Sequence, residues 1–159
     1  MTRLLFVCHG NICRSPMAEY VMKWLVDQAG LNAQYEISSA ATSTEEIGNA
    51  VYPPARRKLA EHGITCHGHA ARQITRRDYD YYDLIIGMDD WNLRNMHRFF
   101  GGDPAGKISL LMDFTPHPHS VADPWYTDDF EATWRDCLEG CQCLLRQLSD
   151  VDNSTFATR

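Results

Sequence analysis

The sequence has no long apolar run, and its basic residues are in the minority. Even a clear apolar stretch such as 4–8 falls far short of the ~20 apolar residues that a membrane-spanning helix needs. Fifteen Lys and Arg face 21 Asp and Glu, and the net charge of -6 disfavours a broad surface for nucleic acid or anionic lipid. No signal-peptide pattern precedes the first apolar stretch. We therefore expect a cytoplasmic protein that binds neither nucleic acid nor membrane.

The six cysteines do not indicate a disulfide framework. An even number would allow three disulfides in a secreted protein, but nothing else in the chain suggests secretion, so free thiols are expected. Cys137 and Cys141 lie on the apolar stripe of a C-terminal helix, where core positions are expected. Neither the cysteines nor the seven histidines have the spacing of a familiar metal site. We expect no metal and no other cofactor.

What the sequence does contain is an alternation of strand and helix patterns. At 159 residues with 44% hydrophobic composition, the chain matches a single domain, expected over 1–149 with a frayed tail over 150–159. Strands are predicted at 3–8, 35–40, 82–88 and 107–112, and helices at 15–29, 52–62, 89–100 and from about 130 to 148. This order predicts an α/β fold with a four-stranded, doubly wound parallel sheet and helices on both faces. Its ligand site is expected at the carboxyl ends of the strands.

The first strand ends in a loop with the composition of an anion-binding site. Cys8 and Arg14 are six positions apart, and the following Ser-Pro predicts a helix start with Ser15 as its N-cap. Free N–H groups at a helix start stabilise both a phosphate and a thiolate, and an arginine can hold two phosphoryl oxygens. Cys66 and Arg72 have the same spacing, but neither a strand before them nor a helix after them. Only the first copy is therefore expected to hold a nucleophile.

Transfer of a phosphoryl group to a thiolate also needs an acid that protonates the leaving group. The chain has two Asp-Pro dipeptides. Asp103 lies in a Gly-rich turn after a helix, where a turn role is expected. Asp123 lies in a long loop and is followed closely by Trp125 and Tyr126, which could form an apolar wall for a ring-bearing substrate. Asp123 is therefore the candidate acid, and the two aromatic residues are candidate substrate contacts.

These two motifs resemble those of a known family, the low-molecular-weight protein tyrosine phosphatases. The segment 7–16, Val-Cys-His-Gly-Asn-Ile-Cys-Arg-Ser-Pro, is similar to that family's phosphate loop, and Asp-Pro-Trp-Tyr at 123–126 is similar to its general-acid loop. The resemblance implies a flavodoxin-like domain. It also implies that Cys8 is the nucleophile, that Arg14 binds phosphate and steadies the transition state, and that Asp123 is general acid and then base. Phosphotyrosine-containing proteins would be the substrates and inorganic phosphate a product.

The resemblance also assigns residues around the nucleophile. Ser15 matches a residue that stabilises the thiolate, and Asn11 and His69 match positions that brace the loop. Cys13 matches a second cysteine that in the family can form a reversible disulfide with Cys8. The expected substrate contacts in the loop and at its rim are His9, Gly10, Asn11, Ile12, Cys13, Ser15 and Glu45.

Two features near the loop bear on the choice of substrate. Glu45 and Glu46 lie where relatives from higher organisms often carry an aromatic wall residue, so the rim is expected to be acidic and to bind acidic phosphopeptides poorly. Ile12 matches the tyrosine phosphatases, whereas the related protein-arginine phosphatases have Thr at this place. The resemblance thus favours phosphotyrosine.

Other functions stay open for a chain with this loop. A protein-arginine phosphatase or a thiol-dependent arsenate reductase would share the cradle, although the reductase needs relay cysteines and none lies between Cys66 and Cys137. A non-catalytic phosphopeptide-binding module would keep the cradle without turnover, and a flavin carrier would share the fold alone. The intact set of Cys8, Arg14 and Asp123 favours an enzyme. The sequence does not indicate the oligomeric state.

Overall fold

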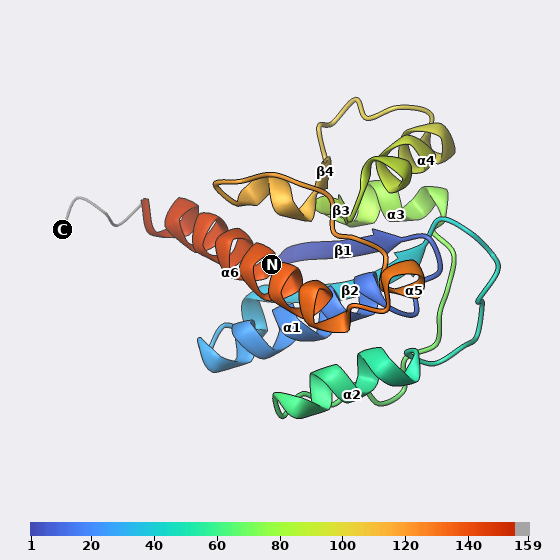
Figure 1. The fold of residues 1–159 in the computed structure, drawn as a ribbon. Helices are drawn as coiled ribbons and strands as arrows, with labels where there is room; N and C mark the ends of the chain where they lie inside the picture. Colours follow the sequence, from blue (N-terminus) through green and yellow to red (C-terminus); the bar gives the residue numbers. More distant parts are fainter. Residues whose placement is uncertain (155–159) are drawn as a thin grey trace.

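Within residues 1–154, which the computed structural model describes with side chains through residue 149, four parallel strands lie between two layers of helices (Figure 1). The strands are β1 (Thr2–Cys8), β2 (Tyr35–Ala41), β3 (Leu84–Gly87) and β4 (Ile108–Leu110). The α-helices are α1 (Arg14–Gln28), α2 (Pro53–Glu61), α3 (Arg76–Tyr81), α4 (Asp90–Phe100), α5 (Pro124–Thr127) and α6 (Phe130–Ser154). Two short 3-10 segments, η1 (Asn32–Gln34) and η2 (Leu111–Phe114), precede β2 and follow β4.

The strand order is β2-β1-β3-β4, which places β1 inside the sheet. Cys8 pairs with Ala41 of β2, and Val7 pairs with Gly87 of β3. Helices α1, α2 and α6 lie on one side of the sheet and α3 and α4 on the other (Figure 1). The predicted α/β fold with helices on both faces is therefore confirmed. Because all strands are parallel, the loops after β1 and β3 leave the sheet at the same edge.

Side chains of β1 alternate between two hydrophobic clusters. Leu4, Phe6 and Cys8 pack with residues of α1 and α6, whereas Leu5 and Val7 pack with residues of α4 and its neighbours. All five side chains are buried. A strand that is covered on both faces has apolar residues at successive positions, which explains the unbroken apolar stretch in the sequence.

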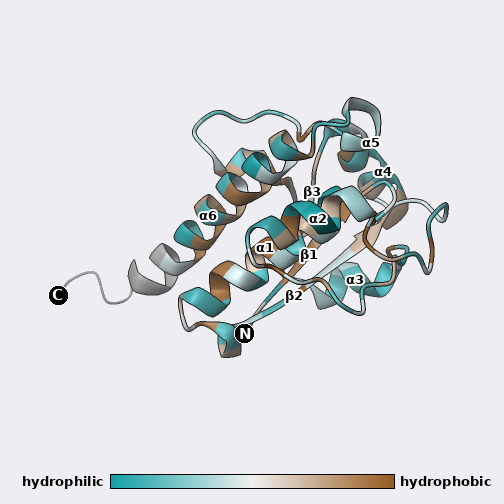
Figure 2. Ribbon diagram, turned by 60° about the horizontal axis from the view of Figure 1, so that its bottom comes forward, coloured by the Kyte–Doolittle hydropathy of each residue, from teal (hydrophilic) through white to brown (hydrophobic). Residues whose placement is uncertain are grey.

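Helix α6 covers one face of the sheet beside α1 (Figure 1). Hydrophobic and hydrophilic residues alternate along its ribbon (Figure 2), and the buried residues include Cys137 and Cys141, as predicted. The helix backbone continues to Ser154, beyond the last apolar position used to predict its end. The expected tail thus overlaps the helix at 150–154, and residues 155–159 lie outside the described residues. Nowhere in the described part of the chain does a helix combine the length and apolar content that crossing a bilayer requires.

Three local predictions need correction. Helix α1 begins at Arg14, so Ser15 lies inside its first turn, and the N-cap position falls on Cys13 without a side-chain cap. Helix α3 was not predicted, because six residues are too few for a hydrophobic period, although Thr75 and Asp78 form a capping box at its start. Strand β4 is shorter than 107–112 because the chain turns into η2 at Leu111.

Candidate active site

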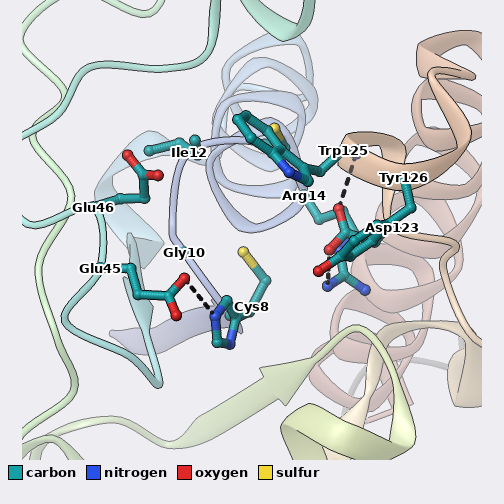
Figure 3. Close-up of a pocket in the computed structure, with 11 residues that line it drawn as sticks. Cys8, Gly10, Ile12, Arg14, Glu45, Glu46, Asp123, Trp125 and Tyr126 are labelled. Atoms are coloured by element: carbon teal, nitrogen blue, oxygen red, sulfur yellow. Dashed lines mark hydrogen bonds and ion pairs between the residues drawn. The ribbon is translucent and has the colours of Figure 1, made fainter.

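The loop between β1 and α1 borders a cavity of about 140 Å³ at the carboxyl edge of the sheet (Figure 3). The loop after β2 and the segment around α5 complete it. The lining residues are Cys8, His9, Gly10, Ile12, Cys13, Arg14, Glu45, Glu46, Asp123, Trp125 and Tyr126. The structure thus brings the two sequence motifs together. Three of the predicted site residues, Asn11, Ser15 and His69, do not line the cavity. Asn11 and Ser15 contact the sulfur of Cys8, and His69 contacts the backbone of Asn11.

Two donors face the sulfur of Cys8, which is only 3% exposed. The backbone N–H of Asn11 lies 3.3 Å from Sγ, and Ser15 Oγ lies 3.1 Å from it. The first turn of α1 has no side-chain cap, which leaves its first N–H groups available to an anion. A negative charge on the sulfur, or on an anion bound above it, is therefore stabilised by oriented dipoles.

Asn11 is the centre of the loop's support. It is fully buried and has a φ of 60°, a left-handed conformation that Asn tolerates better than most residues. Its Nδ2 donates to Ser15 Oγ and to Ser39 Oγ, both at 2.9 Å. Because Ser15 Oγ accepts this bond, its own proton is left to donate, either to Cys8 Sγ at 3.1 Å or to the Ala40 carbonyl oxygen at 3.5 Å. The shorter contact is the one to the sulfur.

The segment 69–72 holds the loop from another side. His69 Nε2 donates to the Asn11 carbonyl oxygen at 2.8 Å, and the backbone N–H of Arg72 donates to Asn11 Oδ1 at 3.2 Å. The Arg72 guanidinium is itself fixed by both carboxylate oxygens of Asp78. Arg72 therefore supports the loop that begins at Cys8. In the sequence it belongs to the second pair with the Cys–Arg spacing, Cys66 and Arg72, which is not expected to hold a nucleophile.

The guanidinium of Arg14 is buried at the edge of the cavity. Its Nη1 donates to Asp89 Oδ2 at 2.6 Å and to the Val121 carbonyl oxygen at 2.9 Å, and its Nη2 lies 3.4 Å from Asp123 Oδ2. Burial alone lowers the pKa of Arg14, but the negative charges of Cys8, Asp89 and Asp123 outweigh burial and raise this pKa above its usual value. The guanidinium thus stays charged, and its orientation beside Cys8 is fixed before any ligand binds.

Asp123 reaches the cavity from the loop that precedes α5. Its Oδ1 accepts a hydrogen bond from the Trp125 N–H at 3.0 Å, while Oδ2 faces Arg14. Two residues earlier, the Val121 N–H donates to the carbonyl oxygen of Met88, just after β3. This bond attaches the loop to the sheet, so the carboxylate of Asp123 is held at the cavity (Figure 3).

Asp103, the other candidate acid, has a structural role. The Tyr79 hydroxyl and the N–H groups of Lys107 and Ile108 all donate to its carboxylate. These bonds fix the turn between α4 and β4, and Asp103 does not line the cavity. The predicted turn role is confirmed.

The walls of the cavity differ in character (Figure 3). Glu45 and Glu46 lie on one side and Trp125 and Tyr126 on the other. Glu45 Oε2 lies 3.0 Å from His9 Nε2, which holds this carboxylate next to the loop. Tyr126 is 84% exposed, so it marks the outer edge of the aromatic wall. The mouth is therefore acidic on one side and aromatic on the other.

Comparison with known proteins identifies the family. Residues 3–153 match the family model described as low molecular weight phosphotyrosine protein phosphatase. The chain belongs to this family. A protein of that name from Rattus norvegicus is 40% identical over 149 residues, which cover 91% of this chain and 94% of the relative. The crystal structure of YfkJ from Bacillus subtilis matches with a TM-score of 0.91 at 35% identity, covering 94% of this chain and 96% of that chain. DARP, a drosophila arginine phosphatase, matches with a TM-score of 0.82 at 29% identity, covering 93% of this chain and 98% of that chain.

All six cysteines of the phosphatase lie in the described part of the chain, and all are free. Cys13 lines the cavity together with Cys8. Burial, and after it the charge of Cys8, raises the pKa of Cys13 to about 12, so Cys13 is a neutral thiol at pH 7. The Cys8–Cys13 disulfide stays a prediction. Among the described residues, no three His, Cys, Asp or Glu side chains are grouped so that they could hold a metal ion.

Four residues that position the phosphatase's site were not predicted from the sequence, namely Ser39, Arg72, Asp89 and Val121. Ser39 lies 28 residues from its partner in the loop, and Val121 lies 107 residues from Arg14, so no local pattern connects them. Asp89 had a local signal, because it is the first residue of the helix predicted at 89–100 and Asp is a good N-cap residue. One carboxylate oxygen does cap α4, and the other binds Arg14.

Replacement of Asn11 by Ala is expected to lower the free energy of unfolding by about 2–4 kcal/mol. The substitution removes the three side-chain hydrogen bonds described above and places Ala in a left-handed conformation that it disfavours. Urea unfolding of the phosphatase measures the change. As a control, Asn32→Ala removes an exposed side chain that bonds to Asp27 and should change stability by less than about 0.5 kcal/mol. Equal losses in both variants would contradict the buried network.

Proposed function

We propose that this phosphatase hydrolyses phosphotyrosine in proteins through a cysteinyl-phosphate intermediate, in the cytoplasm. The observation that carries the proposal is the meeting of Cys8, Arg14 and Asp123 at one cavity whose loop supplies hydrogen-bond donors to the sulfur. The matched family and the names of its members support the substrate class. The six free thiols agree with a reducing compartment.

In the first step, the Cys8 thiolate attacks phosphorus. The S–P bond forms while the bond from phosphorus to the tyrosine oxygen breaks. The loop N–H groups and Arg14 bind the three outer phosphoryl oxygens and stabilise the charge that they carry in the transition state. Asp123 begins this step protonated and donates its proton to the departing phenolate oxygen. Tyrosine leaves, and the phosphoryl group stays on sulfur.

In the second step, Asp123 acts as a base. Its carboxylate takes a proton from a water molecule, whose oxygen attacks phosphorus as the S–P bond breaks. The electron pair of that bond returns to Cys8 as a thiolate, which the Ser15 hydroxyl and the Asn11 N–H stabilise. Inorganic phosphate leaves, and Asp123 is protonated again for the next cycle.

The walls of the cavity support a phosphorylated ring as the substrate. Cys8 is almost fully buried, while Ile12 and Trp125 add apolar surface to the lining of the cavity. A tyrosine ring fills such a space, whereas a serine side chain is shorter and would draw the peptide backbone into it. A phosphoarginine guanidinium would have to be buried against Ile12 without a hydrogen-bond partner from that side chain, which is costly.

The test compares three peptides that differ only in the phosphorylated residue: phosphotyrosine, phosphoserine or phosphoarginine. Phosphate release is measured with reduced protein in EDTA. We expect kcat/KM for the phosphotyrosine peptide to exceed the values for the other two peptides by at least about 100-fold. Of the three phosphorylated side chains, only the tyrosine ring matches the apolar walls while its phosphoryl group meets the polar loop. Faster release from phosphoarginine would replace the proposal by an arginine phosphatase. Phosphate binding without release from any peptide would indicate a binding module.

A further inference from the structure

Next to the catalytic cavity lies a second cavity of about 310 Å³, which we call the side cavity. Its lining residues are His9, Arg14, Asp89, Trp91, Asn92, Asp123 and Tyr126. His9, Arg14, Asp123 and Tyr126 line the catalytic cavity as well. The two cavities therefore adjoin at these shared residues. A substrate that is anchored above Cys8 and is longer than phosphotyrosine can reach the side cavity over His9 and Tyr126.

Trp91 is the large side chain of the side cavity that the proposed reaction does not use. It lies in the first turn of α4 and is 57% exposed. The start of this helix is held firmly, because Asp89 accepts from the Asn92 N–H and the buried Asn92 side chain accepts from the N–H groups of Met88 and Asp89. The indole is therefore presented from a rigid element, as a binding surface requires.

Among the residues with described side chains, the aromatic ones that are more than half exposed all lie at these cavities. Trp91, Trp125 and Tyr126 are all more than half exposed and all line one or both cavities. Scattered exposed apolar residues need no explanation, but a group of them around two adjoining cavities marks a surface that is covered when a ligand binds.

The charged side chains that line the side cavity have partners. Asp89 and Asp123 both face Arg14. The guanidinium of Arg94 lies over the Trp91 ring, 5.0 Å from its centroid. Both lining carboxylates are thus already paired with Arg14, and the lining residue His9 is paired with Glu45, so an acidic or basic ligand meets no unpaired charged side chain among the lining residues. What remains available is aromatic surface, which favours an apolar or aromatic partner.

We infer that the side cavity is a second substrate subsite, which binds a large apolar or aromatic side chain near the phosphotyrosine in the substrate. The inference rests on the proposed function, since the phosphoryl group above Cys8 is what anchors the substrate. Contacts at Trp91 are the same in the bound substrate and in the transition state, so they lower KM and leave kcat nearly unchanged. Burial of about half of a large apolar side chain corresponds to a gain of about fivefold to tenfold in kcat/KM.

The test uses a phosphotyrosine peptide with Ala at the neighbouring positions, and a set of peptides in which Phe replaces one Ala at a time. For the wild type, one Phe position is expected to raise kcat/KM by about fivefold to tenfold, through KM. Trp91→Ala should lose this gain, and Trp91→Phe should keep most of it. Tyr81→Ala is a matched control, because Tyr81 is also an exposed ring beneath an arginine, Arg3, but lines neither cavity. This variant should keep the whole gain.

Four results would count against the inference. A gain from Phe at no position, or a gain that Trp91→Ala retains, would overturn the subsite while leaving the proposed function intact. A Trp91-dependent gain from Arg or Glu, with none from Phe, would overturn the apolar class of ligand. If no peptide releases phosphate, the Ala peptide included, the proposed function itself is wrong, and the subsite is lost with it.

Discussion

Replacement of Cys8 by Ser is expected to lower kcat for a phosphotyrosine peptide by at least about 10⁴-fold. The Asn11 N–H and the Ser15 hydroxyl lie within hydrogen-bond distance of the atom at this position, but as donors they do not remove a proton from it. A serine hydroxyl at position 8 therefore stays protonated and is a poor nucleophile. Single-turnover release of phosphate measures the loss without interference from product release.

The same variant should still bind the product, because the loop N–H groups and Arg14 are unchanged. Titration calorimetry with inorganic phosphate is expected to give a Kd within about tenfold of the wild-type value, or 1.4 kcal/mol. Cys143→Ser, which changes a partly buried cysteine outside the cavity, serves as the matched control and should keep full activity. Turnover by Cys8→Ser at more than about a hundredth of the wild-type rate would contradict Cys8 as the nucleophile.

Asp123→Asn is expected to slow the first step by about 10²–10⁴-fold for an ester with a poor leaving group, such as phenyl phosphate. For p-nitrophenyl phosphate the loss in this step should be less than about tenfold, because nitrophenolate leaves without a proton. The second step loses its base in both cases. A burst of nitrophenol followed by slow turnover would therefore appear in rapid-mixing experiments, as the phosphoryl group accumulates on Cys8.

The other Asp-Pro dipeptide supplies the control for this prediction. Asp103→Asn removes charge from the turn between α4 and β4, where Asp103 accepts three hydrogen bonds, and it should lower stability more than activity. Its activity per folded molecule is expected to match the wild type for both esters. Equal slowing of both esters in the first step by Asp123→Asn would show that another group is the acid.

The parts of the fold that the sequence predicts well are those with a local cause. The apolar stretch of β1, the end of α1 near residue 29 and the start of α4 at Asp89 each depend on a few neighbouring residues, among them Gly30 with its left-handed conformation. Helix α3 escaped because one and a half turns carry no readable period. Ser15 was predicted to be the N-cap of α1 because Ser followed by Pro is typical of a helix start. In the structure it lies in the first turn of the helix, and its hydroxyl contacts Cys8.

The same difference between local and tertiary causes applies to the residues of the site. Cys8, Arg14 and Asp123 could be proposed from motifs, since each lies in a segment whose composition suits its chemistry. The groups that hold them could not, because their partners are set by the sheet order. Val121 reaches Arg14 only because its loop is bonded beside β3, and Ser39 reaches Asn11 only because β2 is the neighbour of β1. Such contacts depend on tertiary structure and leave no trace in local sequence.

The distribution of these supports along the chain sets the order in which the enzyme matures during synthesis. Cys8 precedes in the chain all the distant residues that support its site: its loop is held by Ser39, His69 and Arg72, and Arg14 is held by Asp89 and Val121. A nascent chain with only β1 and α1 therefore cannot form the cradle. The full set of supports is present only when the last strand and the segment beyond it are in place, so we expect shorter chains to lack activity and phosphatase activity to report the folding of the whole domain.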